Sequence, residues 1–174
     1  MISGNRSLHD VLLGLKGFDF ERKHDAVAFR KWALANQSTA WAIALTYVVV
    51  IFSIKWFMKD RPRFTLRGPL ALWNLATAMF SIVAALRTLP YMFRMLSKHG
   101  AMFTICDESL YHDEVVSFWG SMFMLSKVPE LIDTLFIVLR KQQLILLHWY
   151  HHASVVVFVF VSYPSWVGSG LFYM

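Results

Sequence analysis

The segment from Thr39 to Met58 most restricts how this chain can fold, because it is mostly apolar over about 20 residues. A helix of that length is about 30 Å long, which matches the hydrocarbon core of a bilayer. In lipid, only helices and closed barrels satisfy every backbone hydrogen bond. Three more apolar segments follow, at about 70–89, 115–139 and 144–163. We therefore predict an all-α, multi-pass transmembrane helix bundle with about four spans.

The composition agrees with a membrane protein. Hydrophobic residues make up 57% of the 174 residues and charged residues only 16%, whereas about 25% of a soluble domain is charged. The formal net charge of +6 would also suit a nucleic-acid-binding protein, but Lys and Arg cluster at the edges of the apolar segments. That distribution is typical of contacts with anionic lipid headgroups. We therefore expect a lipid bilayer as a partner, and no nucleic acid.

The first 38 residues differ from the rest because aromatic side chains occur among charged ones at roughly helical spacing. This pattern predicts an interfacial helix, with a loosely ordered tail as the alternative. We divide the chain into this segment, 1–38, and a transmembrane domain, 39–174. Near the end of the second span, we expect Arg87 to extend its guanidinium to the membrane interface, with a buried role as the alternative.

The loops predict an orientation in the membrane. The 59–68 and 140–141 turns are basic, whereas the 96–114 loop is acidic. The positive-inside rule then places the N-terminus in the lumen. Glycosylation sequons at Asn5 and Asn36 support this orientation, and the basic residues of the N-terminal segment argue against it.

Six ionisable side chains interrupt the apolar sequence of the third and fourth spans: Lys127, Glu130, Asp133, His148, His151 and His152. Such groups are costly in hydrocarbon unless they are paired, hydrated or turned inward, so they indicate a functional site. At 100° per residue, the three histidines fall on one face of a helix, within about 100° of arc. On the preceding helix, Lys127, Glu130 and Thr134 share a stripe with Asp133 at its margin. Because the turn between the helices is short, we expect them to pack antiparallel and to bring the acids and histidines together.

Several functions fit this cluster. Histidines at i, i+3 and i+4 can bind a metal, but the other histidines form no second cluster like those of membrane di-iron oxidases. A proton relay or transporter would also use charged groups, but no repeat links 39–95 with 115–163. A neutral imidazole can attack a thioester while a carboxylate fixes its tautomer. The remaining alternative is a set of polar residues that only hold helices together.

At these positions the chain resembles the very-long-chain fatty acid elongases, the condensing enzymes of the endoplasmic reticulum. The family motif K-x-P-E-L-x-D-T is matched by Lys127, Pro129, Glu130, Leu131, Asp133 and Thr134. The motifs L-R-K and H-x-x-H-H are matched by Leu139, Arg140, Lys141, His148, His151 and His152. The likeness extends more loosely through G-P-L-A-L-W and F-S-I-V-A-A-L-R-T in the second span. The Trp149-Tyr150 filler resembles members that act on saturated and monounsaturated chains.

The resemblance implies a very-long-chain 3-oxoacyl-CoA synthase, which condenses a fatty acyl-CoA with malonyl-CoA to a 3-ketoacyl-CoA. It implies an acyl-histidine intermediate, for which we expect His151 to be the nucleophile and His148 and His152 its orienting or acid–base partners. Glu130 and Asp133 are expected to position the histidines. The expected substrate-binding residues are Lys127, Thr134, Arg140 and Lys141. The resemblance implies no metal and no cofactor besides the two substrates.

Elongases have seven spans, and a motif N-x-x-H-x-x-M-Y-x-Y-Y follows their histidine box, whereas this sequence reaches Met174 after four. We therefore expect the chain alone to be inactive or to need a partner that completes its pocket. A membrane interaction partner of a complete elongase is the non-enzymatic alternative. The resemblance also predicts the endoplasmic reticulum membrane, and homo- or hetero-oligomers with elongases and other elongation-cycle enzymes.

Overall fold

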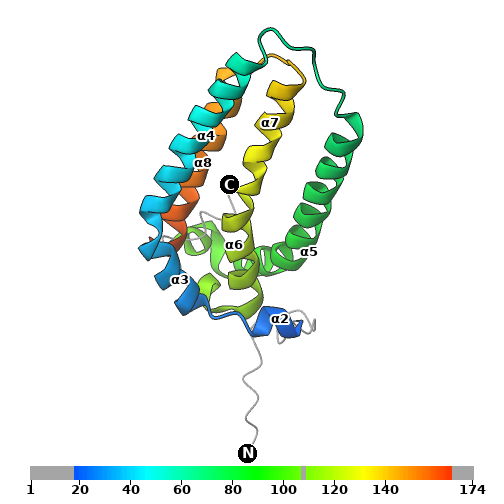
Figure 1. Cartoon of the computed structure of the whole chain (residues 1–174). Helices are drawn as coiled ribbons and strands as arrows, with labels where there is room; N and C mark the ends of the chain where they lie inside the picture. The colour runs from blue at the N-terminus through cyan, green and yellow to red at the C-terminus, as the bar shows by residue number, and fades with distance from the viewer. Residues whose placement is uncertain (1–17, 107–108, 166–174) are drawn as a thin grey trace, which may run out of the picture.

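The computed structural model describes residues 18–106 and 109–165, and all regular structure within them is helical (Figure 1). The sequon at Asn5 lies outside the described residues. In chain order, with the labels of Figure 1, the elements are α2 Asp19–Arg22, α3 Ala26–Ala35, α4 Gln37–Phe57, α5 Arg67–Cys106, η1 Ser109–His112, α6 Glu114–Ser126, η2 Pro129–Leu131, α7 Ile132–Leu139 and α8 Leu146–Ser165.

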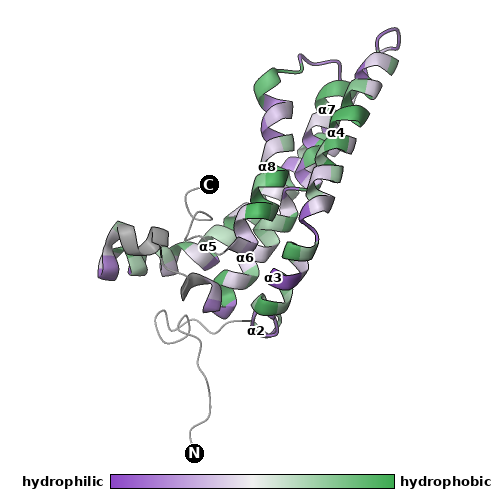
Figure 2. Ribbon diagram, turned by 90° about the vertical axis from the view of Figure 1, so that its left-hand side faces the viewer, coloured by the Kyte–Doolittle hydropathy of each residue, from purple (hydrophilic) through white to green (hydrophobic). Residues whose placement is uncertain are grey.

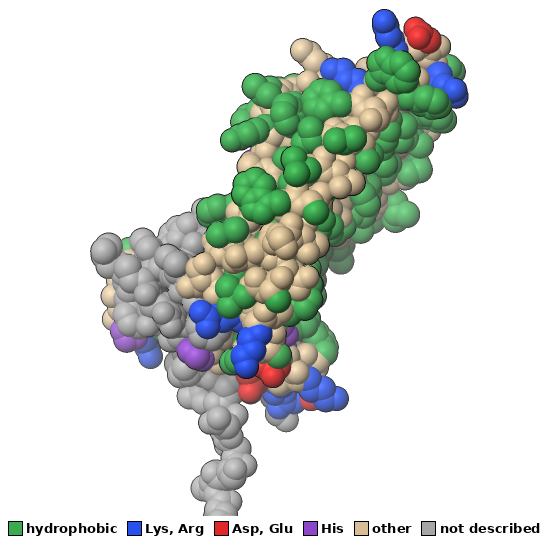
Figure 3. Space-filling view, turned by 60° about the vertical axis from the view of Figure 1, so that its left-hand side comes forward, with side chains coloured by type: hydrophobic (Ala, Val, Ile, Leu, Met, Phe, Trp, Pro, Cys, Tyr) green, Lys and Arg blue, Asp and Glu red, His purple; other side chains and the backbone are tan. Residues whose placement is uncertain are grey.

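Two helices in the described part are long and apolar enough to cross a membrane: α4 and the Arg67–Ala101 portion of α5. The prediction for the first span, 39–58, agrees with α4 to within two residues. Figure 2 shows hydrophobic residues along most of α4 and α8 and hydrophilic residues in the loop after α4. On the face in Figure 3, hydrophobic side chains cover the middle and Lys and Arg gather towards the two ends. The predicted helical membrane bundle is confirmed, while the count of four spans stays a prediction.

The core lies where α3, α4, α6 and α8 meet. Its buried residues are Ala33, Ala40, Tyr111, Met124, Val156, Val159, Phe160 and Tyr163. Ala40 and Ala44 are both buried in α4, and small side chains there let α4 and α8 approach each other closely. A second cluster of Tyr47, Ile51 and Val138 joins α4 to α7. α4 therefore packs against both α7 and α8 (Figure 1).

Two predicted boundaries were wrong. The third span, 115–139, is not one helix, because α6 ends at Ser126 and Pro129 begins the short η2 before α7. Proline lacks an N–H and its ring clashes with a preceding carbonyl, so it breaks a helix here. The predicted 96–114 loop is largely helical, since α5 continues to Cys106 and is interrupted only at Gly100, where φ is 80°. The non-helical backbone of Gly100 divides this part of α5 into two helical pieces, so helix continues on both sides of the glycine.

The part of the N-terminal segment that the structure describes is helical. The carboxylate of Asp25 accepts a hydrogen bond from the backbone N–H of Ala28 and so caps α3. Asn36 lies at the junction of α3 and α4, and its side-chain amide donates to the carbonyl of Trp32 at 2.8 Å. Residues 19–35 thus favour the helical interpretation over the loosely ordered tail.

Arg87 is partly buried and forms an ion pair, which favours the alternative of a buried role. Its guanidinium donates to the carboxylate of Glu21 through Nε at 2.9 Å and Nη2 at 2.5 Å. Glu21 is fully buried and also accepts from the indole N–H of Trp119 and the backbone N–H of Phe18, both at 2.7 Å. Burial alone would raise the pKa of Glu21, but these hydrogen bonds and the Arg87 charge lower it below its ordinary value. We call these four residues the Glu21 cluster.

Candidate active site

The interruption at Pro129 fixes an ion pair between Lys127 and Glu130. The ammonium of Lys127 lies 2.8 and 2.9 Å from the two carboxylate oxygens of Glu130. The hydroxyl of Ser126 donates to the same carboxylate at 3.0 Å. The Lys127 ammonium also lies 4.3 Å from the centre of the Phe123 ring, within the range of a cation–π contact. Both charged side chains are therefore held in place at the end of α6.

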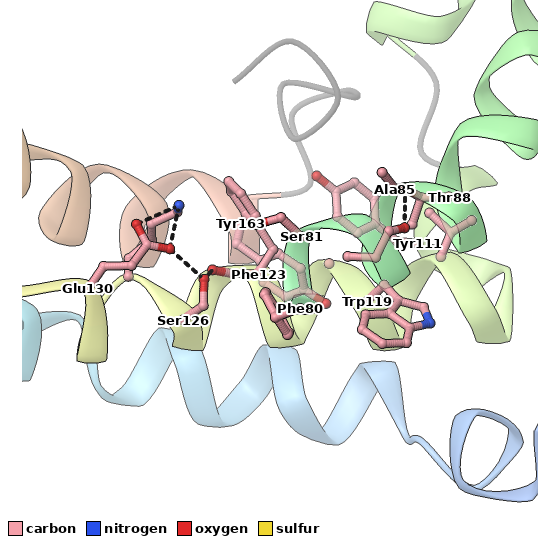
Figure 4. A pocket seen from close by; sticks show the side chains of 14 residues that line it. Phe80, Ser81, Ala85, Thr88, Tyr111, Trp119, Phe123, Ser126, Glu130 and Tyr163 are labelled. Atoms are coloured by element: carbon pink, nitrogen blue, oxygen red, sulfur yellow. Dashed lines mark hydrogen bonds and ion pairs between the residues drawn. The ribbon is translucent and has the colours of Figure 1, made fainter. Parts of the chain in front are cut away.

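A pocket between α5 and α6 begins at this ion pair, with a volume of about 230 Å³ (Figure 4). Its wall is mainly apolar and aromatic, and Glu130 and Trp119 lie towards opposite ends of it in the close view. We call it the α5–α6 pocket. It is lined by Phe80, Ser81, Ala84, Ala85, Thr88, Tyr111, Val116, Trp119, Gly120, Phe123, Ser126, Lys127, Glu130 and Tyr163.

Two further polar residues of the motif, Asp133 and Thr134, lie outside this pocket. Thr134 is fully buried, and its hydroxyl lies 2.7 Å from the hydroxyl of Tyr47 and 3.1 Å from Nε2 of His148. A carboxylate oxygen of Asp133 accepts a hydrogen bond from the indole N–H of Trp73 on α5. The predicted common stripe of Lys127, Glu130 and Thr134 does not form, because the chain changes its helical path at Pro129.

The three histidines form one group at the start of α8. The ring centres of His148 and His152 are 4.5 Å apart, and those of His151 and His152 are 5.8 Å apart. His148 and His152 are partly buried, whereas His151 is exposed. α7 and α8 run in opposite directions, as predicted (Figure 1). His148 contacts Thr134 of α7, whereas the hydrogen bonds of Glu130 and Asp133 among the described residues go to other groups, so the expected meeting of acids and histidines stays a prediction.

The two basic residues after α7 differ in their surroundings. Arg140 ends the helix, with its backbone N–H bonded to the carbonyl of Phe136. Lys141 adopts a left-handed conformation, with φ of 54°. Its ammonium donates to the carbonyls of Lys59 and Arg61, at 2.8 Å each. Lys141 thus joins the basic loop after α4 to the turn after α7, and one of its three N–H donors stays available to an anion.

A polar network from the connection between α2 and α3, from α6 and from α8 reaches the pocket wall. Nε2 of His24 lies 2.9 Å from the hydroxyl of Ser121, which lies 2.7 Å from the hydroxyl of Tyr163. Burial lowers the pKa of His24, and the neighbouring Asp25 charge opposes this effect only in part. Burial and the neighbouring Tyr163 raise the pKa of Tyr111 to about 12. His24 and both tyrosines are therefore neutral at physiological pH.

The described residues contain no group of three or more His, Cys, Asp or Glu side chains that could hold a metal ion. Sequence reasoning missed Tyr47, Trp73 and Trp119 as partners of the charged and polar groups. Tyr47 and Trp119 carry no local signal, because they contact residues far away in the sequence. Trp73 is the last residue of the G-P-L-A-L-W segment that resembles the elongases, and that position was the available signal.

Residues 32–174 match the ELO family, described as the GNS1/SUR4 family. This chain belongs to the ELO family. The predicted elongase family is thereby confirmed, and the match covers every element of the ELO chain from the last turn of α3 onwards.

Relatives of this ELO chain are named as very long chain fatty acid elongases, in agreement with the family match. It is 45% identical over 158 residues to very long chain fatty acid elongase 6 of Drosophila melanogaster, covering 90% of this chain and 50% of that protein. It is 41% identical over 163 residues to elongase 6 of Gallus gallus, covering 94% and 62%. It is 38% identical over 172 residues to elongase 3 of Homo sapiens, covering 98% and 62%. The chain thus spans 50–62% of the length of these relatives. No solved structure matches it.

Proposed function

We propose that this ELO chain carries the condensation site of fatty acid elongation, where a fatty acyl-CoA and malonyl-CoA give a 3-ketoacyl-CoA. The observation that carries the proposal is the 3.1 Å contact between His148 and Thr134. This contact joins the H-x-x-H-H motif to the K-x-P-E-L-x-D-T motif, so we assign both motifs to one site. The relatives named as elongases support the same reaction class, a 3-oxoacyl-CoA synthase.

In the first proposed step, an unprotonated ring nitrogen of His151 attacks the thioester carbonyl of the acyl-CoA. The carbon–sulfur bond breaks, and the departing CoA takes up the proton that the acylated ring loses. His151 suits this role because its side chain is exposed and forms no side-chain hydrogen bond among the described residues. His152 and His148 lie in a row behind it and can accept and return the proton.

In the second proposed step, malonyl-CoA loses carbon dioxide and leaves an enolate. The enolate carbon bonds to the acyl carbonyl carbon, and the carbon–nitrogen bond to His151 breaks. The imidazolate that leaves takes up a proton from solvent, passed on by His152, and the neutral imidazole is restored. We assign Glu130 and Asp133 to positioning the histidines. Lys127 would offset negative charge that develops on oxygen.

Arg140 and Lys141 are proposed to bind the phosphates of CoA. Lys141 is held by two backbone carbonyls of the basic loop after α4, so its charge is fixed at the end of the bundle. This placement supports a cytosolic position for that end, because CoA thioesters are soluble substrates, and hence a lumenal N-terminus in the endoplasmic reticulum membrane.

The α5–α6 pocket is the proposed site of the fatty acyl chain. An engineered apolar cavity of about 150 Å³ already binds benzene, and this pocket is larger, at about 230 Å³. Its apolar wall matches a hydrocarbon, and the Lys127–Glu130 pair marks its polar end. The similarity to elongases 6 and 3 fits the group acting on saturated and monounsaturated chains.

Condensation by purified membranes that contain only this chain tests the proposal. The assay supplies radiolabelled malonyl-CoA and a series of saturated acyl-CoAs. We expect label in a 3-ketoacyl product, its loss in His151→Ala, and its retention in His99→Ala, which changes an exposed histidine of α5 outside the site. Activity unchanged in His151→Ala would refute the nucleophile assignment. A folded chain without any activity would instead favour the interaction-partner alternative.

A further inference from the structure

The Glu21 cluster adjoins one end of the α5–α6 pocket through Trp119. Trp119 belongs to both, because its ring lines the pocket while its N–H donates to Glu21. In Figure 4, its indole nitrogen is directed away from the other labelled side chains. Thr88 also lines the pocket and directly follows Arg87, which makes the ion pair with Glu21. The wall at this end therefore depends on a carboxylate that comes from α2.

α2 is held against α5 and α6 by few other contacts. The rings of Phe20 and Phe118 meet edge to face at 5.2 Å. The guanidinium of Arg87 lies 4.9 Å from the centre of the Phe18 ring. A helix of four residues has no stability of its own. Its position therefore depends on Glu21, whose carboxylate accepts two hydrogen bonds from Arg87 of α5 and one from Trp119 of α6.

A wall of this kind resists a longer ligand more strongly than an apolar wall. Apolar side chains can change rotamer to admit an extra methylene, so they discriminate weakly between chain lengths. A hydrocarbon that pushed past Trp119 would instead break the hydrogen bond from its indole N–H to the buried carboxylate of Glu21. Stability alone does not require the ion pair of Glu21 and Arg87, because apolar residues in its place would pack as well.

We propose that Trp119, held by the carboxylate of Glu21 from α2, is the end wall of the α5–α6 pocket and limits the length of the acyl chain that the pocket accepts. The inference rests on the proposed function, in which this pocket holds the chain. From Trp119 to the end of α6 at Ser126 the sequence advances seven residues, which corresponds to about 10 Å of helix. Glu21 is thus a specificity-determining residue that acts through Trp119 and Arg87.

Photolabelling of the purified full chain tests this inference without requiring turnover. The probes are saturated acyl-CoAs with a diazirine at the end of the chain, in lengths that differ by two carbons. We expect labelling near Thr88 and Trp119 up to a maximum length in the unaltered protein. In Glu21→Gln, the maximum should increase by at least one two-carbon step. The matched control is Asp19→Asn, which removes an acid of the same helix whose side chain is 83% exposed and pairs with Arg22.

The outcomes separate the two proposals. A folded Glu21→Gln with an unchanged maximum length would overturn the end-wall inference while leaving the acyl pocket intact. Absence of pocket labelling at every length in the unaltered protein would overturn the acyl pocket, and the inference with it. If Glu21→Gln does not fold, Arg87→Lys decides by the same measure, since it keeps the charge beside Glu21, removes the two-point guanidinium contact and changes no residue of the pocket wall.

Discussion

The hydroxyl oxygen of Thr134 lies 3.1 Å from Nε2 of His148 and so connects α7 to α8. The same oxygen lies 2.7 Å from the hydroxyl of Tyr47, which adds α4. A threonine hydroxyl donates one hydrogen bond and accepts others, so it can serve both partners at once. This single buried oxygen fixes the ring of one box histidine relative to two other helices.

Replacing Thr134 with valine keeps the volume and removes that hydroxyl. We expect a loss of about 1–3 kcal/mol in the free energy of unfolding, because the Tyr47 hydroxyl is left buried without its partner. Unfolding in detergent micelles measures this loss. Adding Tyr47→Phe should recover part of it, and Thr134→Ser should cost less than Thr134→Val. Equal stability of Thr134→Val and the unaltered protein would contradict the prediction.

Trp73→Phe should release Asp133 from α5. The lost bond joins an N–H to a carboxylate, a class worth about 1.5–3 kcal/mol, so we expect a decrease in unfolding free energy at the lower end of that range. Trp56→Phe is the control, since Trp56 is 79% exposed, and its replacement should change stability by less than about 0.5 kcal/mol. Similar losses in both variants would show that the Trp73–Asp133 bond contributes nothing specific.

The pH dependence of stability should include a contribution from His24. Burial lowers its pKa in the folded protein from the ordinary value of 6.5. Below that value the unfolded chain binds more protons than the folded one, so stability decreases as the pH falls from 6.5 towards the folded pKa. Thermal unfolding of the unaltered protein and of His24→Gln, measured across this range, should differ in slope. Parallel curves would mean that His24 titrates alike in both states.

Ala85→Leu should narrow the α5–α6 pocket, because Ala85 forms part of its wall. If the pocket holds the acyl chain, the preferred substrate should become shorter by at least one two-carbon unit. The product distribution from a mixture of saturated acyl-CoAs measures this change. An exposed leucine of the same helix provides the control, with Leu72→Ala expected to leave the distribution unaltered. An unchanged distribution in Ala85→Leu would place the chain elsewhere.

The sequence predicted what depends on local pattern. α4 was predicted closely because about 20 apolar residues in lipid have few alternatives to a helix. The histidine cluster followed from spacing alone. The contact between Glu21 and Arg87 could not be predicted, because 66 positions separate them and neither neighbourhood indicates the other. For the same reason, Trp73 was not recognised as the partner of Asp133, 60 positions away.

The interruption at Pro129 has a consequence for how the motif can vary. It divides eight consecutive residues between two sides of the backbone, so that Lys127 and Glu130 adjoin α5 while Thr134 faces α4 and α8. The two halves of the motif therefore contact different helices. Substitutions on the α5 side can reshape the pocket without altering the groups that surround Thr134.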